Sequence, residues 1–306
     1  MSVTVSTSQP VTIIMGRDRP ALTAWLLLGP CVLYLFFFSI YPLIYSLRLS
    51  FTDLTAATGT GNFVGLENYR ALLVDPLFWN AFVNSTVMVT AAVALQVVLG
   101  VALALFFDLD LKGAWIVRGI LLLPMLITPI VVGVMWRALL NPDWGLVDWS
   151  IHAIGLIPPD WLGSVGMSMV TLILVDTWQW TPFVFIIVFA RLQALPREVF
   201  EAAEVDGAGP VVKFRRVILP MLMPAIVFAA VFRAVDAFRS FDLIYGLSYG
   251  GPARGTTTLA FFSFQNGFQF QNYGYAAAVA YMMLLILILG TTVLLRYVQL
   301  RPRHVR

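Results

Sequence analysis

The feature that most constrains this chain is a series of six long apolar runs. They lie at about 22–46, 82–106, 117–139, 168–190, 221–246 and 275–298. Roughly 20 apolar residues cross the hydrocarbon core of a bilayer as one helix, and backbone groups in lipid must form their hydrogen bonds within the segment. Charged residues make up only 11% of the chain, against about a quarter in an average soluble domain. We therefore predict an all-α membrane protein with six transmembrane helices.

The distribution of lysine and arginine predicts how these helices are oriented. If the N-terminus is cytoplasmic, thirteen of the nineteen basic residues fall in cytoplasmic segments and only Arg48, Arg70, Arg137 and Arg254 fall outside. Cytoplasmic loops carry the excess of positive charge in membrane proteins. Both termini and the polar segment near residue 200 are therefore expected in the cytoplasm. The predicted organisation is a flexible cytoplasmic N-terminus (1–20), a first transmembrane helix (21–47), an external loop (48–80), a five-helix core (81–298) that includes a cytoplasmic loop (191–220), and a cytoplasmic tail (299–306).

That polar segment is unusually charged for its surroundings, and it predicts a short helix. Pro196 suits the first turn of a helix, acidic residues follow near the positive end of the helix dipole, and Gly207 can adopt the left-handed conformation that ends one. We expect a helix over about 196–206. A second short amphipathic segment should follow it, and the fifth span should begin at Pro220. The alternative is an amphipathic loop on the lipid headgroups, which would favour basic and aromatic residues over three glutamates.

At these residues the chain resembles a known pattern. Glu-Ala-Ala at 201–203 precedes Asp-Gly-Ala at 206–208, and Phe-x-x-Val-x-Leu-Pro follows at 214–220. This resembles the cytoplasmic loop of permease subunits of binding-protein-dependent ABC importers. The resemblance implies the type I importer transmembrane fold and a coupling helix, within 196–220, that inserts into a separate ATPase subunit. The residues that would carry this coupling are Glu201, Ala202, Ala203, Asp206, Gly207, Ala208, Phe214, Leu219 and Pro220.

The same resemblance implies the partners. The chain has no Gly-x-x-x-x-Gly-Lys-Ser/Thr phosphate-binding loop, so ATP and Mg²⁺ would be bound by partner ATPase subunits and this chain would carry no cofactor and no enzyme activity. A second, different permease subunit and an external solute-binding protein are what the resemblance implies would complete the importer. The expected location is the cytoplasmic (inner) membrane of a bacterium or archaeon. Metal binding is not expected from two separated histidines and one cysteine.

The fifth apolar run carries charges of alternating sign at every third residue. Arg233, Asp236, Arg239 and Asp242 recur with a spacing that allows neighbours to pair on a helix. Ionisable residues at membrane depth usually face a bundle interior or a wet cavity. They could line a substrate path, together with Tyr245, or pair with one another to hold helices together. The segment also resembles the fifth span of sugar-importing permeases, which implies a sugar, a polyol or a glycerol phosphate ester as the solute.

The fourth run contains a second polar group around Pro182. Asp176 and Gln179 could form hydrogen bonds to a solute while Trp178 or Trp180 stacks on a sugar ring. A proline inside a span bends the helix and frees a carbonyl group. Tryptophan is also enriched at membrane–water interfaces. The alternative is therefore that one of the two tryptophans belongs to the aromatic belt there and does not contact a solute.

Two other classes of protein are weighed against this interpretation. Gly246-Leu247-Ser248-Tyr249-Gly250 fits the Gly-x-Ser-x-Gly pattern of serine hydrolases, but that motif needs a strand-to-helix turn and here it follows a predicted helix. A stand-alone secondary transporter would be expected to show internal repeats, and none is evident between the two halves of the chain.

Overall fold

The computed structural model describes residues 20–109 and 113–299, and the chain divides into two units, 1–48 and 49–306. In the first unit, helix α1 (Pro20–Leu35) continues through a π-helical turn (Phe36–Ile40) into α2 (Tyr41–Leu49). Residues 27–49 are long and apolar enough to span a membrane. Of the expected N-terminal segment (1–20) and tail (299–306), all but Pro20 and Gln299 lie outside the described residues.

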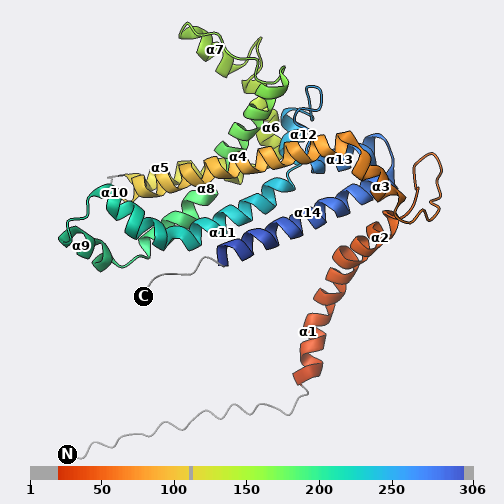
Figure 1. The fold of residues 1–306 in the computed structure, drawn as a ribbon, viewed down its shortest axis with the longest axis horizontal. Coiled ribbons are helices and arrows are strands. Elements are labelled where there is room, and N and C mark those ends of the chain that lie inside the picture. The colour runs from red at the N-terminus through yellow and green to blue at the C-terminus, as the bar shows by residue number, and fades with distance from the viewer. Residues whose placement is uncertain (1–19, 110–112, 300–306) are drawn as a thin grey trace, which may run out of the picture. The chain divides into compact units, whose positions relative to one another are not determined.

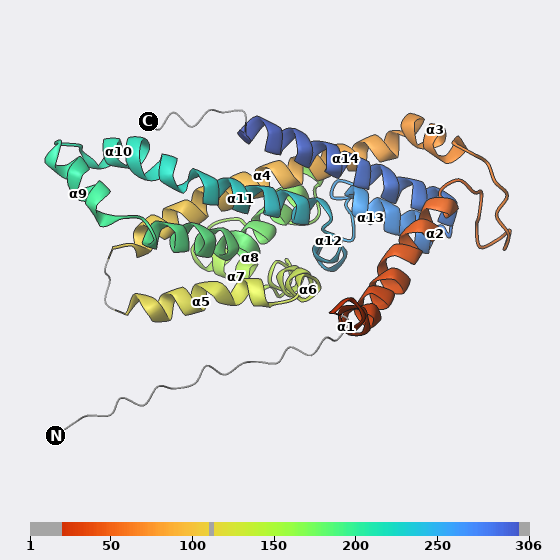
Figure 2. The same ribbon diagram turned by 90° about the horizontal axis from the view of Figure 1, so that it is seen from below.

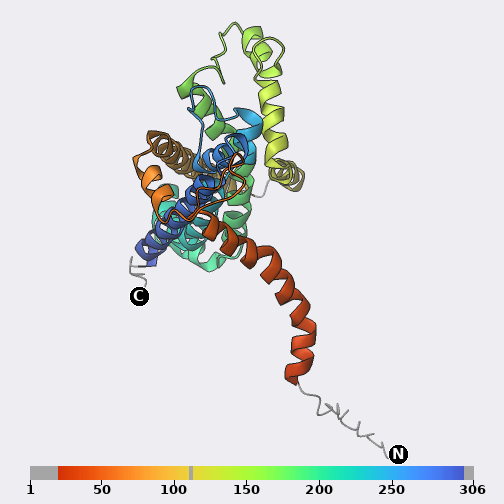
Figure 3. The same cartoon turned by 90° about the vertical axis from the view of Figure 1, so that its right-hand side faces the viewer.

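The second unit is a bundle of helices. Its elements are α3 (Glu67–Val74), α4 (Pro76–Phe107), α5 (Ala114–Leu126), α6 (Pro129–Leu139), α7 (Leu146–Ala153), α8 (Val165–Gln193), α9 (Arg197–Val205), α10 (Pro210–Lys213), α11 (Leu219–Phe238), α12 (Asp242–Leu247), α13 (Leu259–Phe264) and α14 (Tyr273–Gln299). Helices α4, α8, α11 and α14 run side by side (Figures 1 and 2). Helices α6 and α7 project from this bundle, as its end-on view also shows (Figure 3).

The centre of the bundle is the contact between α4 and α8. Buried residues recur at every fourth position of α4, namely Met88, Ala92, Gln96, Gly100 and Ala104. Side chains four residues apart share one face of a helix, and small residues on that face let two membrane helices approach closely. A Cβ atom at Gly100 would lie 2.8 Å from the Val184 side chain of α8. The spacing of small residues therefore fixes where α4 and α8 cross.

The structure confirms an all-α fold, and its described residues contain five helices that could span a membrane, or six spans if one bent helix pair is counted as one. That pair is α5 and α6, which meet at an angle of 99° where the third span was expected as one helix over 117–139. The break falls at Ile127 and Thr128, whose extended backbone angles precede Pro129. A residue before proline is sterically driven out of the helical region.

The fifth span also differs from its expected range of 221–246. The helix starts earlier, at Pro210, and continues through a π-helical turn (Phe214–Ile218) into α11, which ends at Phe238. A separate short helix, α12, begins at Asp242. The second short piece expected after Gly207 is thus the first turn of the fifth span itself. The α9 segment is therefore connected to this bundle helix by only a short link, residues 206–209.

Helices α6 and α12 cross at two glycines. A Cβ atom at Gly246 would lie 2.6 Å from the carbonyl oxygen of Ile130, and one at Gly133 would lie 2.8 Å from the carbonyl oxygen of Leu243. Arg137 of α6 also donates a hydrogen bond to the carbonyl of Leu247, at 2.7 Å. The backbones of the two short helices are therefore in direct contact.

Gly246→Ala is accordingly expected to lower the thermal unfolding midpoint of the detergent-purified protein. The added methyl group meets backbone atoms that cannot rotate away, and overpacking of this kind costs about 1–3 kcal/mol. Gly166→Ala is the matched control, because a Cβ atom there would have no neighbour within 4 Å. An unchanged midpoint for Gly246→Ala would show that the crossing is looser than the structure indicates.

Candidate functional site

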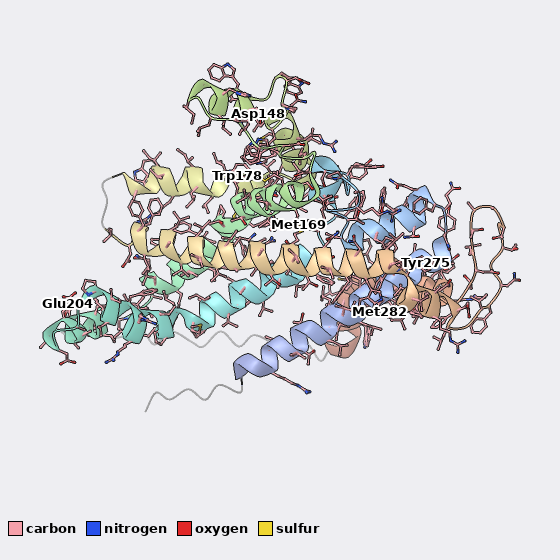
Figure 4. All side chains as sticks on the ribbon, turned by 45° about the horizontal axis from the view of Figure 1, so that its top comes forward. Asp148, Met169, Trp178, Glu204, Tyr275 and Met282 are labelled. Atoms are coloured by element: carbon pink, nitrogen blue, oxygen red, sulfur yellow. The ribbon has the colours of Figure 1, made fainter. Side chains whose placement is uncertain are left out.

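The first candidate site is the α9 segment, which protrudes at one end of the bundle beside α10 (Figures 1 and 2). Its helix, Arg197–Val205, matches the predicted range of about 196–206. Glu204 marks the position of this segment in Figure 4, at the end of the molecule opposite Tyr275. The segment is therefore accessible from outside the bundle.

The end of α9 is built by Gly207. This residue has a φ angle of 74°, in the left-handed region that glycine adopts without steric cost. The amide of Ala208 donates to the carbonyl of Ala203 at 2.9 Å, and the amide of Gly207 donates to the carbonyl of Glu204 at 3.0 Å. These two bonds form a Schellman motif, which satisfies carbonyl groups at the end of a helix.

One face of α9 is attached to the bundle. Phe200 packs against the buried cluster that contains Phe185, Val188 and Leu222. Lys213 forms an ion pair with Glu204 at 2.5 Å, and its ammonium lies 5.4 Å from the centre of the Phe200 ring. Helix α9 is thus held on α10 by Lys213 and on the bundle by the packing of Phe200.

The opposite face of α9 is open, and we call it the coupling surface after the role that the sequence predicts for it. It consists of Glu201, Ala202, Val205, Asp206 and Gly207, all of them exposed. Val205 is 87% exposed and lies beside carboxylates. The other predicted coupling residues support this surface or border it: Ala203 is buried, Ala208, Phe214 and Leu219 are partly buried, and Pro220 is exposed.

The second candidate site is a charged cluster inside the bundle. The Arg233 side chain of α11 is completely buried, and its guanidinium lies 3.0 Å from Oδ2 of Asp176 on α8. Gln96 of α4 joins them, because its amide nitrogen donates to Asp176 at 2.8 Å while its oxygen accepts from Nε of Arg233 at 3.0 Å. Arg233 also pairs with Asp236. We call Gln96, Asp176 and Arg233 the buried triad, and it ties three helices together.

A pocket of about 330 Å³ lies next to the buried triad. Asp236 forms a longer ion pair there with Arg239, at 3.8 Å, and Trp180 stacks against Arg233, whose guanidinium carbon is 4.5 Å from a ring centre. The lining residues come from α6, α8, α11, α12 and the α11–α12 link: Pro129, Asp176, Trp180, Asp236, Ala237, Arg239, Ser240, Phe241 and Asp242. The pocket therefore lies where both interrupted helices break, a common origin of polar sites in transporters.

The structure brings five of the nine residues predicted for a substrate path to this pocket: Asp176, Trp180, Asp236, Arg239 and Asp242. Arg233 is fully buried next to the pocket and does not line it. The Gln179 amide instead donates to the carbonyl of Ile127 at 2.9 Å and so supports the α5–α6 break.

The other two predicted residues take part in aromatic contacts. The Trp178 ring lies 5.4 Å from that of Trp136, as an edge-to-face pair, and Tyr245 packs against Phe241 at 5.4 Å. Figure 4 shows Trp178 among the helices near α6. Neither residue lines the pocket.

Gln96 is the functional candidate that sequence reasoning missed. It is fully buried although its side chain carries both a donor and an acceptor. A buried polar group needs hydrogen-bond partners, so a lone glutamine within the apolar run 82–106 was a usable signal. Only the packing of α4 on α8 and α11 shows what those partners are.

The Gly-x-Ser-x-Gly sequence has no hydrolase geometry. Ser248 follows the short helix α12, and its hydroxyl forms a hydrogen bond with that of Thr256, at 2.7 Å. A nucleophile elbow requires a strand before the serine and a helix after it. The motif is instead part of the turn that ends α12.

Together, the helical bundle, the interrupted spans and the polar pocket at their breaks define a polytopic membrane protein of the transporter class. Solved structures show the same fold. The chain aligns with a subunit of a bacterial alginate ABC transporter, in complex with an alginate pentasaccharide-bound periplasmic protein, with a TM-score of 0.77 at 20% identity, covering 90% of this chain and 93% of that one. A chain of the MetNI methionine ABC transporter aligns with a TM-score of 0.53 at 21% identity, covering 78% and 99%.

The sequence comparison identifies the family. Residues 96–304 match the family described as the binding-protein-dependent transport system inner membrane component, and the chain belongs to this family of ABC importer permeases. The trehalose/maltose transport system permease protein MalF of Thermococcus litoralis is 30% identical, over 92% of this chain and 95% of that protein. The sulfoquinovosyl glycerol permease SmoG of Agrobacterium fabrum is 33% identical, over 91% of each chain. The sn-glycerol-3-phosphate permease UgpA of Salmonella typhimurium is 32% identical, over 95% and 100%.

Proposed function

We propose that this chain forms the translocation path for a carbohydrate-like solute in an ATP-driven importer. The three relatives above are named for a disaccharide, a glycosylated glycerol and a glycerol phosphate ester. The pocket at the helix breaks offers carboxylates, a guanidinium and a hydroxyl to such a solute. Sugars and polyols are rich in hydroxyl groups, and a few well-placed polar side chains are what fixes their orientation in a site.

The coupling surface carries the second half of the proposal. It would dock into a separate ATPase subunit, which binds ATP and Mg²⁺, since this chain has no phosphate-binding loop. The exposed Ala202 and Gly207 permit close approach of a partner backbone, and Val205 supplies an apolar contact that is otherwise left in water. The bias of basic residues supports a cytoplasmic position for this surface and for both termini.

The single observation that carries the proposal is the continuous helix from Pro210 to Phe238. With 29 residues and a rise of about 1.5 Å per residue, it is about 44 Å long. Its first turn holds α9 through Lys213, and its last turns carry Arg233 and Asp236 beside the pocket. A displacement of α9 by the closing ATPase would therefore be transmitted along one helix to the solute site.

The proposed assembly contains this chain, a second and different permease subunit, two ATPase subunits and an external solute-binding protein. The loaded binding protein would dock on the outer side, and closure of the ATPase dimer would drive the bundle to an outward-open state. Solute would then pass through the pocket as the bundle returns from the outward-open state.

The test is uptake of radiolabelled solutes by cells of the source organism, in which this chain and its partner subunits are made together. We expect uptake of a sugar or polyol that is lost when the ATPase gene is deleted. Uptake that persists without the ATPase and is abolished by a proton ionophore would instead establish a stand-alone secondary transporter. Uptake of amino acids alone would disprove the carbohydrate assignment but not the coupling to ATP.

A further inference from the structure

We propose that the pocket selects uncharged polyhydroxylated solutes and excludes solutes that carry a phosphate or sulfonate group. This inference rests on the proposed function, since it narrows the solute class at the same site. Relatives of this chain are named for both kinds of solute, a neutral disaccharide and a phosphate ester. Family membership therefore does not decide between them, and the charges around the pocket do.

The deeper of the two guanidinium groups is already fully engaged. Arg233 is completely buried, and its nitrogens bond to Gln96, Asp176 and Asp236. The ring of Trp180 also covers it. An anionic solute would have to displace one of these carboxylates to reach Arg233, which would leave that carboxylate without its cation in the bundle interior.

The second guanidinium, Arg239, lines the pocket and is 61% exposed. It lies 3.8 Å from Asp236, so its charge is partly balanced there. The lining as a whole brings Asp176, Asp236 and Asp242 to the pocket against Arg239, with Arg233 behind the wall. There are three carboxylates and two guanidinium groups. If Arg233 is paired with Asp176 and Arg239 with Asp236, the carboxylate of Asp242 has no guanidinium group to balance its charge.

This balance has opposite consequences for the two kinds of solute. A phosphate or sulfonate group only accepts hydrogen bonds at its ionised oxygens, and it would be repelled by the Asp242 carboxylate. Solute hydroxyl groups can donate to a carboxylate, which accepts at both oxygens. They can also accept from Ser240 or Arg239, both in the lining. The pocket volume of about 330 Å³ is within the usual range of small-molecule sites.

The experiment measures uptake of paired probes by the full importer in cells. Suitable pairs are glycerol with sn-glycerol-3-phosphate and trehalose with trehalose 6-phosphate. For the wild type we expect uptake of at least one uncharged member to exceed that of its phosphorylated partner at least tenfold. In Asp242→Asn and Asp242→Lys the ratio of phosphorylated to uncharged uptake should rise at least fivefold, more for lysine than for asparagine.

The same binding protein serves every variant, so a changed ratio belongs to the pocket and not to solute capture outside. Asp143→Asn is the matched control, because Asp143 is an exposed acidic residue outside the pocket lining. Preferred uptake of the phosphorylated members, or a ratio unmoved by Asp242→Lys, would overturn the inference while the importer function stands. Uptake of none of the four probes, with ATP-dependent uptake of amino acids in their place, would refute the proposed solute class and this inference with it.

Discussion

Replacing Arg233 by methionine is expected to destabilise the folded chain by about 3–5 kcal/mol, the usual cost of removing one partner from a buried ion pair. The Asp176 side chain is only 2% exposed, and the substitution would leave its carboxylate with Gln96 as its remaining partner in the buried triad. The measurement is the thermal unfolding midpoint of the purified protein in detergent. Solute uptake should be lost in parallel, because Asp236 would also lose its stronger cation.

The double variant Arg233→Met with Asp176→Leu separates charge from packing. Replacing both members of a buried ion pair by apolar residues of similar size is often neutral or stabilising, so the double variant should unfold at a higher temperature than Arg233→Met alone. Asp143→Ala, at an exposed position, is the control and should unfold like the wild type. Equal midpoints for the wild type and Arg233→Met would show that the triad contributes nothing to stability.

Gly207→Asp is expected to abolish solute uptake and solute-stimulated ATP hydrolysis while the protein still inserts into the membrane. A Cβ atom at Gly207 would have no neighbour within 4 Å, so the folded chain has room for the side chain. The left-handed backbone costs an ordinary residue about 1–2 kcal/mol, which a helical bundle of this size should withstand. The added carboxylate would stand on the coupling surface and hold the ATPase subunit away. Uptake and the amount of ATPase that copurifies with the chain are the two measurements.

Gly155→Asp is the matched control for this variant. Gly155 also has a left-handed backbone, with φ of 79°, and open space around its Cα, and it follows α7 in the part that projects from the bundle. The two substitutions are alike in backbone, space and charge. If both abolish uptake, the cause is strain, and the coupling surface loses its support; wild-type uptake in Gly207→Asp would rule out the proposed docking altogether.

Local signals were sufficient to predict α9. Pro196 before it, Glu198 in its first turn and Gly207 after it are all within a few residues of the helix, and each acts through the backbone next to it. The pairing of Arg233 with Asp236 and of Asp236 with Arg239 was accessible in the same way, since the members of each pair are three positions apart in the chain. Hydrophobicity likewise sufficed to find the spans, because the bilayer sets their length.

The interruptions of the spans were harder to predict. A run such as 117–139 is apolar throughout, and apolarity does not distinguish one helix from two that meet at 99°. Pro129 was a local hint, but prolines are also tolerated within spanning helices, and Pro182 and Pro224 lie inside α8 and α11 without ending them. Which proline breaks a helix depends on the partners that take up its freed carbonyl groups. At the α5–α6 break the Ile127 carbonyl is taken up by Gln179 of another helix.

The sequence by itself determined that the chain is a helical membrane protein, where its spans lie approximately, and which charged segment forms the short exposed helix α9. These depend on the bilayer thickness and on interactions between residues close in the chain. Only the tertiary structure decided that Gln96 and Asp176 meet Arg233, that Gln179 and Tyr245 lie away from the pocket, and that Asp242 faces it. The reason is physical: a buried charge must find its partner on whichever helix packs against it, and that choice is made by the crossing of α4, α8 and α11 and not by spacing along the chain.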